Sequence, residues 1–414
     1  MPFSAARFTE SVSKWLFFLV GFSTFLPIGM SYLFILCLGL LLATSSTYRQ
    51  SRTAVSNSWY WYFLLFLLWP AFTMIFNWHD DSLVRWWHCW RVAIIVWLAL
   101  TMTLHERNCL IQGFASGAIY AIAVVLTHEY LMTLPEWVGW HQLLSVTGNA
   151  SSQKWVMLAA AIGIVLNFAF SSERTEIQRI TLSLIALLLV WMVFAFSISR
   201  NSYLVAAAMP LALLTYHIRK PRLWPLIVPL ALTLGMLIIH LSPQASLRFY
   251  LAWNEFQSFL ETGDLDGSVN VRTQMLLTAW HTMWEHPIVG AGLGSWQEIW
   301  HQVSARYPEM AKQNNPHNDF LLWGMETGIL GLMLVVALLV RLGRDAWIQS
   351  NLSGGVAWAL LWALTITSLV NAPLRDNSLG LSLLLLTVAY SNPKLASTRQ
   401  GGYLAREGLN NSRV

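Results

Sequence analysis

Three polar side chains stand at the edges of strongly apolar segments, where ionisable groups are costly and are functional candidates for that reason. Arg200 lies in the polar cluster Ser197–Ser202, Arg272 lies near the start of an amphipathic run, and His317 lies in Asn314–Asp319, just before another apolar run. The planar fork of arginine suits phosphate oxygens, and imidazole suits proton transfer near neutral pH. These residues predict a site that binds an anionic group beside a proton acceptor.

Each of the three also has a plainer interpretation, which the sequence leaves open. Arg200 is compatible with an arginine that anchors a helix end at the membrane surface. Arg272 is compatible with an ordinary solvated arginine, although a cation near a helix N-terminus opposes the helix dipole. His317 is compatible with a capping loop in which the imidazole is incidental. Histidine alone is weak evidence, because the same side of the chain carries His79, His281, His286 and His301.

A tryptophan-rich segment, Arg85–Arg91, opens another apolar run. An interfacial belt of Trp and Arg accounts for this segment, whereas Arg91, which lies deeper, is also a candidate to face a polar cavity. Glu326 falls inside a later apolar run and is placed either to orient the site or to hydrogen-bond within the bundle. No DxD, HExxH or His/Cys cluster with metal spacing occurs, nor does a Walker-type glycine loop. We therefore expect a reaction that uses no metal, no cofactor and no ATP.

The elements that position these residues are predicted to be membrane-spanning helices. The chain has 414 residues, of which 56% are hydrophobic and 11% charged, against about 25% charged residues in a soluble domain. Because a spanning helix needs roughly 20 apolar residues, we predict an all-α polytopic integral membrane protein with about twelve transmembrane helices. Residues 1–414 then form a single membrane domain. The predicted spans are 14–29, 31–46, 58–77, 86–104, 110–128, 154–171, 180–198, 202–217, 223–241, 319–340, 353–371 and 377–391.

The distribution of Lys and Arg sets the predicted orientation. With the N-terminus in the cytoplasm, every short cytoplasmic loop carries a basic residue, as the positive-inside rule requires. Both termini are then cytoplasmic, and segment 242–318 is one long segment on the outer side of the membrane. Its apolar residues recur at helical spacing, which predicts three helices, the second over 271–286 and the third from Ser295 to about Ala311. Gly290, Gly292 and Gly294 predict a tight, flexible turn between them. We interpret the net charge of +5 as a topology signal, with no nucleic-acid partner.

The residues from Arg272 to Leu332 resemble a known family, the O-antigen ligase and polymerase superfamily. The resemblance rests on an arginine-containing helix, the turn His286-Pro287-Ile288-Val289-Gly290-Ala291-Gly292-Leu293-Gly294, His317-Asn318 before a span, and Glu326-Thr327-Gly328-Ile329-Leu330-Gly331-Leu332 within it. Ser199-Arg200-Asn201 is similar to the family's arginine at the start of a periplasmic turn. The order and the spacing of these pieces make the resemblance more specific than any one of them.

The resemblance implies a multi-pass protein of the bacterial inner membrane with its active site facing the periplasm. Segment 242–318 would then be a large periplasmic loop that holds part of the active site. It implies an inverting transfer of a glycan from undecaprenyl diphosphate to an acceptor hydroxyl, with membrane lipids around the protein. Arg200 and Arg272 would hold the diphosphate and His317 would be the essential histidine, with Asn318 and Arg91 as further candidates for substrate contact. The sequence does not decide the roles of four other arginines and one acid, which are Arg85, Arg248, Arg306, Arg375 and Glu326.

Within this family the sequence favours an O-antigen ligase, whose acceptor is lipid A–core. Polymerases often carry arginines in two periplasmic loops, and here the second-largest outer loop, about 129–153, has none. Protein O-oligosaccharyltransferases tend to have an added C-terminal region, and here only a short polar stretch follows the last span. A membrane transporter is the alternative from another class. It would need ionisable residues deeper in the membrane and a repeat between halves, and we find no such repeat.

Overall fold

The computed structural model describes residues 5–395, except for 53, 133, 135–148, 172–173, 198, 220–221, 223–224, 226–228, 230–232, 234, 238–239, 264–266, 307–312 and 376. Every regular element in these residues is a helix, which confirms the all-α prediction. Seven of the described helices are long and apolar enough to cross a bilayer. The chain is therefore a multi-pass, all-α membrane protein.

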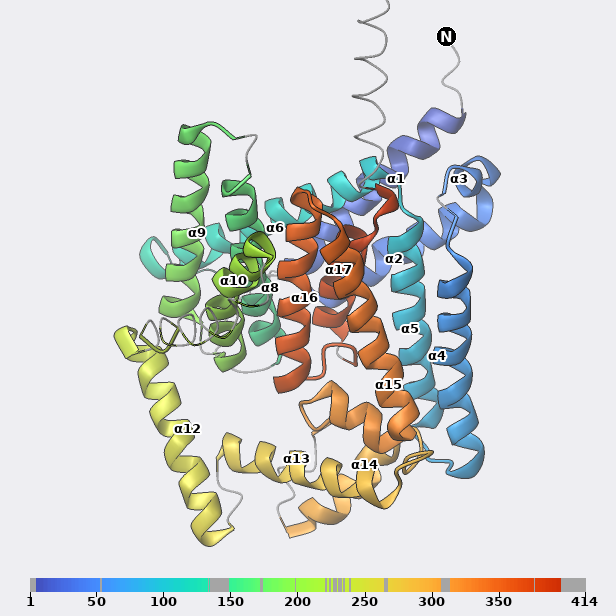
Figure 1. The fold of residues 1–414 in the computed structure, drawn as a ribbon, viewed down its shortest axis with the longest axis vertical. Helices are drawn as coiled ribbons and strands as arrows, with labels where there is room; N and C mark the ends of the chain where they lie inside the picture. The colour runs from blue at the N-terminus through green and yellow to red at the C-terminus, as the bar shows by residue number, and fades with distance from the viewer. Residues whose placement is uncertain are drawn as a thin grey trace, which may run out of the picture.

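The long helices lie side by side in one bundle (Figure 1). Proline interrupts or precedes several of them, as at Pro27, which lies between the 3₁₀ turn η1 (Ser23–Phe25) and α2. The other elements of the bundle are α1 (Ala5–Phe22), α2 (Ile28–Thr44), α3 (Ser46–Gln50), α4 (Asn57–Phe76), α5 (Ser82–Thr101), α6 (Leu104–Tyr130), α8 (Asn149–Ala169), α9 (Glu176–Phe196), α10 (Arg200–Ile218), α15 (Asp319–Ile348), α16 (Leu352–Val370) and α17 (Asn377–Ser391).

Apart from two, the predicted spans fall on helices in the structure, and α2, α10 and α17 among them are not in the set of seven that are long and apolar enough to cross a bilayer. The span predicted over 223–241 lies mostly outside the described residues, as does most of the outer loop 129–153. The span predicted over 14–29 corresponds to a helix that begins at Ala5 and gives way to η1 after Phe22. Apolar runs therefore located the helices well, because twenty apolar residues in lipid have few other ways to satisfy their backbone groups.

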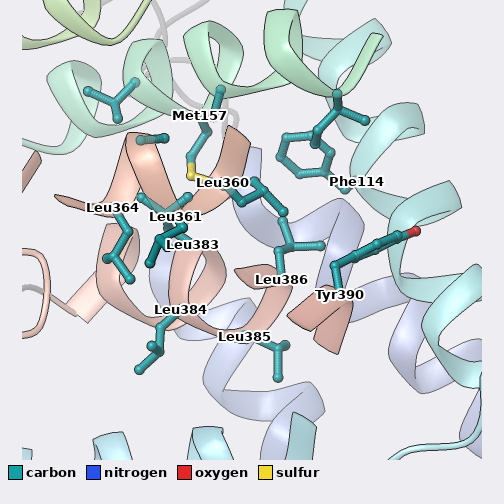
Figure 2. Close-up of a cluster of buried hydrophobic side chains, with 14 of the residues drawn as sticks. Phe114, Met157, Leu360, Leu361, Leu364, Leu383, Leu384, Leu385, Leu386 and Tyr390 are labelled. Carbon is teal, nitrogen blue, oxygen red and sulfur yellow. The ribbon is translucent and has the colours of Figure 1, made fainter. Parts of the chain in front are cut away.

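The centre of the bundle is formed by α16 and α17 against α8 and α6. Figure 2 shows Leu360, Leu361 and Leu364 of α16 beside Leu383 and Leu386 of α17. Met157 of α8 and Phe114 of α6 close the cluster, and all of these side chains are buried. Since lipid tails are as apolar as leucine, this core stabilises the bundle by close packing rather than by release of water.

Close contact between α1 and α6 depends on small residues. A Cβ on Gly113 would collide with the backbone of Phe18, and one on Gly21 would collide with the carbonyl of Leu110. Gly117 lies one turn beyond Gly113, and a Cβ on it would come within 2.8 Å of the carbonyl oxygen of Phe22. This spacing of small residues lets two membrane helices approach at backbone distance.

Three further helices lie together at the end of the bundle opposite to the start of α1 (Figure 1). They are α12 (Pro243–Thr262), α13 (Ser268–Glu285) and α14 (Ser295–Val303), and the 3₁₀ turn η3 (Ser304–Arg306) follows α14. The prediction of three helices in segment 242–318 is confirmed. The third is shorter than expected within the described residues, and its N-cap is Gly294 instead of Ser295. Arg272 lies one turn inside α13 because that helix starts three residues earlier than predicted.

Candidate active site

The turn from His286 to Gly294 is built into the bundle. The amide N–H of Ala291 donates to the carbonyl of Met325 at 2.7 Å, and that of Ile329 donates to the carbonyl of Pro287 at 2.9 Å. These bonds are possible because α15 is kinked at Gly328, whose φ is 68°. A Cβ on Gly290 would come within 2.5 Å of the backbone of Glu326 and Thr327. Close approach of two backbones, rather than the flexibility we expected, is what requires glycine there.

A second segment holds the same turn from the other side. The hydroxyl of Ser82 donates to the carbonyl of Leu293 at 2.6 Å, and Nδ2 of Asn77 donates to the carbonyl of Gly290 at 3.4 Å. His79 places Nε2 at 2.9 Å from the carbonyl oxygen of Ala291 and Nδ1 at 2.9 Å from a carboxylate oxygen of Glu298. The turn between α4 and α5 therefore fixes the start of α14.

Helix α14 in turn fixes the segment that leads to His317. Its two tryptophans, Trp296 and Trp300, are buried and stacked on one another. Nε1 of Trp296 donates to the carbonyl of Gln313 at 2.9 Å, and Nε2 of Gln297 donates to Oδ1 of Asn314 at 2.8 Å. These two hydrogen bonds hold Gln313 and Asn314 in place, just before His317.

His317 has a backbone conformation that few residues adopt. Its φ is 55°, in the left-handed region, and its amide N–H donates to Oδ1 of Asn315 at 2.9 Å. A non-glycine residue held in this region costs about 1–3 kcal/mol, and such strain is concentrated at functional sites. The side chain is 8% exposed, and its Nδ1 lies 3.1 Å from Oδ1 of Asn371. The sequence analysis did not single out Asn371, which follows the end of α16.

The surroundings of His317 keep its imidazole neutral at pH 7. The pKa of His317 is lowered to about 4, first by burial and then by the positive charge of Arg272, while the bond to Asn371 acts in the opposite direction. A neutral imidazole can accept a proton. The same shift shows that Arg272 lies within electrostatic reach of His317.

Arg272 also lies within electrostatic reach of Arg200. The pKa of Arg272 is lowered first by loss of hydration and then by the charge of Arg200, while Glu255 of α12 opposes the shift. Its side chain nevertheless remains exposed to solvent, and that of Arg200 is half-buried. The carboxylate of Glu255 acts on both arginines, and one of its oxygens accepts from the amide N–H of Val269 at 2.8 Å. Two like charges held near each other favour an anionic ligand between them.

The structure places the two remaining predicted residues in supporting positions. Nη2 of Arg91 donates to the carbonyls of Leu374 and Arg375, both at 2.9 Å, and the side chain is buried. Asn318 caps α15, since its Oδ1 accepts from the amide of Leu321 at 2.9 Å and its Nδ2 donates to the carbonyl of Leu369 at 2.9 Å. Their contact with substrate stays a prediction, because both side chains are already engaged by protein.

The connection between α16 and α17 is the part of the site that the sequence analysis missed. Oδ2 of Asp319 accepts from the amide of Leu374 at 3.0 Å and from the hydroxyl of Ser368 at 3.1 Å. Asn371 and Arg375 are polar residues at the end of an apolar run, which is the signal that singled out Arg200.

Within the described residues, no group of three or more His, Cys, Asp or Glu side chains could hold a metal ion.

Part of the chain matches a family of known proteins. A family model described as O-antigen ligase matches residues 184–336. The match includes Arg200, Arg272 and His317, whereas Arg91 and Asn371 lie outside it. No curated protein matches the chain.

Proposed function

The chain belongs to the O-antigen ligase/polymerase superfamily, and from this premise we propose that it is an O-antigen ligase. Membership implies an enzyme that transfers glycosyl groups from a lipid-linked donor. In our proposal the donor glycan is carried on undecaprenyl diphosphate and the acceptor is a hydroxyl of lipid A–core. The enzyme works in the bacterial inner membrane, with its site facing the periplasm and both termini in the cytoplasm.

The observation that carries the proposal is the electrostatic coupling of His317 to Arg272 and of Arg272 to Arg200. These residues come from three segments far apart in the sequence, namely the start of α10, the first turns of α13 and the approach to α15. Two cations beside one neutral imidazole match a reaction in which a diphosphate leaves and a hydroxyl proton is removed. If each of the three had only a structural role, there would be no reason for the charge of one to act on the next.

Arg200 and Arg272 bind the diphosphate in this proposal. Hydrogen bonds between guanidinium groups and phosphate oxygens are charge-assisted and directional. They strengthen as the bond between the anomeric carbon and the diphosphate oxygen breaks, because negative charge accumulates on the leaving group. Stabilisation that grows toward the transition state accelerates the reaction rather than only tightening binding.

His317 accepts the proton of the acceptor hydroxyl. The hydroxyl oxygen forms a bond to the anomeric carbon as the diphosphate departs from the opposite face, which inverts the anomeric configuration. Undecaprenyl diphosphate is released, and His317 later returns its proton to water. A general base of this kind contributes about 10²–10⁴ to the rate.

Binding of the donor makes His317 a better base. The charge of Arg272 lowers the pKa of His317 in the free protein. A diphosphate bound to Arg272 offsets that charge, so the pKa of His317 rises toward the range in which a base accepts a proton efficiently. The imidazole would therefore gain basicity when a donor is present to be attacked.

A transfer assay tests the proposal. Purified protein is combined with undecaprenyl-diphosphate-linked glycan and rough lipopolysaccharide, with a chelator and without ATP, and lipopolysaccharide is resolved on a gel. We expect a ladder of glycosylated lipopolysaccharide that is lost in His317→Ala and Arg272→Ala. His281→Ala is the matched control, because His281 is an exposed histidine of α13.

The other outcomes distinguish the alternatives. Growth of the glycan with donor alone, and no transfer to lipopolysaccharide, would make the protein an O-antigen polymerase. Transfer to a serine or threonine hydroxyl would make it a protein O-oligosaccharyltransferase. Full activity of His317→Ala would contradict the assignment of the base.

A further inference from the structure

Asn371 presents a single oxygen to two neighbours. Its Oδ1 accepts from the amide N–H of Ala372 at 2.9 Å and lies 3.1 Å from Nδ1 of His317. A backbone N–H can only donate, so the side-chain atom that it meets must be the oxygen. This contact fixes which way the amide of Asn371 faces, an assignment that distances to His317 alone would leave ambiguous.

The orientation of Asn371 determines the tautomer of His317. Because Oδ1 can only accept, Nδ1 of His317 must carry the hydrogen in this bond. In a neutral imidazole the other nitrogen, Nε2, then holds a lone pair. Among the described residues Nε2 has no hydrogen-bond partner, whereas Nδ1 is engaged by Asn371. The free lone pair is the one that a proton acceptor needs.

The segment that carries Asn371 is held from several sides. Asp319 binds the amide of Leu374, and Arg91 binds the carbonyls of Leu374 and Arg375. Arg375 forms a buried ion pair with Glu326. These contacts connect Asn371 to α5 and α15, so its oxygen keeps a fixed position relative to the imidazole.

An amide suits this position better than a carboxylate. His317 feels the positive charge of Arg272 from α13, and Arg272 feels that of Arg200 from α10. A carboxylate at position 371 would stabilise the imidazolium, so the ring would lose its free lone pair at a higher pH than it does beside asparagine. The neutral oxygen of asparagine orients the ring without favouring its protonated form.

We propose that Asn371 is a positioning residue, which holds His317 in the Nδ1–H tautomer and leaves Nε2 as the atom that takes the acceptor proton. The inference rests on the proposed function for its catalytic meaning. The tautomer itself is a property of the protein and can be observed without any transfer reaction.

The first test observes the tautomer directly. Protein with ¹⁵N-labelled histidine is placed in nanodiscs, and the ring nitrogens of His317 are identified by their absence in His317→Gln. We expect a protonated Nδ1 and a bare Nε2 near pH 7 in the parent protein, and a mixture of tautomers in Asn371→Leu. A parent protein with hydrogen on Nε2 and none on Nδ1 would overturn the proposal, whether or not transfer is detected.

The second test measures kinetics. We expect Asn371→Leu to lower kcat roughly 10- to 100-fold, as for partners that orient an active group, with KM for the donor nearly unchanged. Asn371→Asp keeps the accepting oxygen, so it should recover much of the rate at neutral and higher pH. Its acid limb should move to higher pH, because the carboxylate raises the pKa of His317 and the base is then lost earlier as pH falls.

A matched control separates positioning from folding. Asn351 caps the other end of α16, where its Oδ1 accepts from the amide of Gly354 at 3.1 Å. Asn351→Leu should leave the tautomer and the pH profile unchanged. If Asn371→Leu changed neither the tautomer nor kcat, or if Asn371→Asp left the acid limb in place, the positioning role would be refuted. Absence of transfer by the parent protein, with the expected tautomer, would instead contradict the proposed function alone.

Discussion

Glu326 and Arg375 form an ion pair that solvent does not reach, with 0% and 3% of their side-chain surfaces exposed. The pair joins α15 to the connection between α16 and α17, which carries Asn371. The guanidinium of Arg375 also lies over the ring of Trp323, at 5.6 Å from the ring centre. This ion pair therefore links α15 to the segment that carries Asn371.

Breaking this pair should destabilise the protein strongly. Removal of one partner leaves a buried charge without its counterpart, which costs about 3–5 kcal/mol. We expect Glu326→Gln and Arg375→Met to lower the unfolding temperature in detergent, and the double variant to recover part of the loss. Glu10→Gln is the control, because the pair of Glu10 with Lys14 is exposed and should contribute at most about 1 kcal/mol.

Transfer should persist at moderately acidic pH. The base must be neutral to act, and the pKa of His317 in the free protein is about 4. The acid limb of kcat/KM, which reports the free enzyme, should therefore lie well below the ordinary histidine pKa of about 6.5. The limb of kcat should lie higher, because bound diphosphate offsets Arg272. Initial rates across the pH range check both limbs, and identical limbs would argue against the coupling.

Two substitutions at Arg272 should separate its charge from its geometry. Arg272→Gln removes the charge that lowers the pKa of His317, so the acid limb of kcat/KM should move to higher pH. Arg272→Lys keeps the charge and loses the planar fork, so the limb should stay in place. Both should weaken donor binding, by about tenfold to hundredfold for the loss of charge-assisted bonds. An unchanged limb in Arg272→Gln would contradict the electrostatic link.

Glycine 290 should tolerate alanine much less well than glycine 263. Both have a left-handed backbone, with φ of 74° and 70°, so alanine costs about 1–2 kcal/mol at each from conformation alone. A Cβ on Gly263 meets nothing within 4 Å, whereas one on Gly290 meets the backbone of Glu326 and Thr327. Gly290→Ala should therefore lower both the unfolding temperature and the transfer rate. Equal effects of the two substitutions would show that the close approach is unimportant.

The sequence predicted the helices because a segment that crosses lipid must form all its backbone hydrogen bonds internally, and a long apolar run does this as a helix. It singled out Arg200, Arg272 and His317 because charge at a membrane boundary is costly. The structure brings His317 within electrostatic reach of Arg272, and Arg272 within reach of Arg200, and their roles in the reaction remain a proposal. The free-energy cost of placing each charged side chain at the membrane boundary was enough to single it out, although the sequence does not show which helices are neighbours.

The sequence could not show which polar groups meet. Asn371 contacts His317 from the far end of another helix, and no local pattern encodes that pairing. Arg91 binds backbone carbonyls, and every residue has one. The sequence therefore showed that a buried arginine here would be costly, but it did not show which groups bind that arginine. The glycines of the turn 286–294 indicated a bend, but the backbone that lies against Gly290 belongs to α15 and became visible only in three dimensions.

The turn from His286 to Gly294 is bonded on one side to α15 at its kink and on the other to the turn between α4 and α5. The segment that carries this turn is therefore not a detachable module. A chimera that exchanges residues 243–318 between relatives to alter specificity would have to carry the 77–82 turn and the kinked part of α15 with it. Donor preference in such enzymes should then be inherited as a set of three distant segments rather than as one loop.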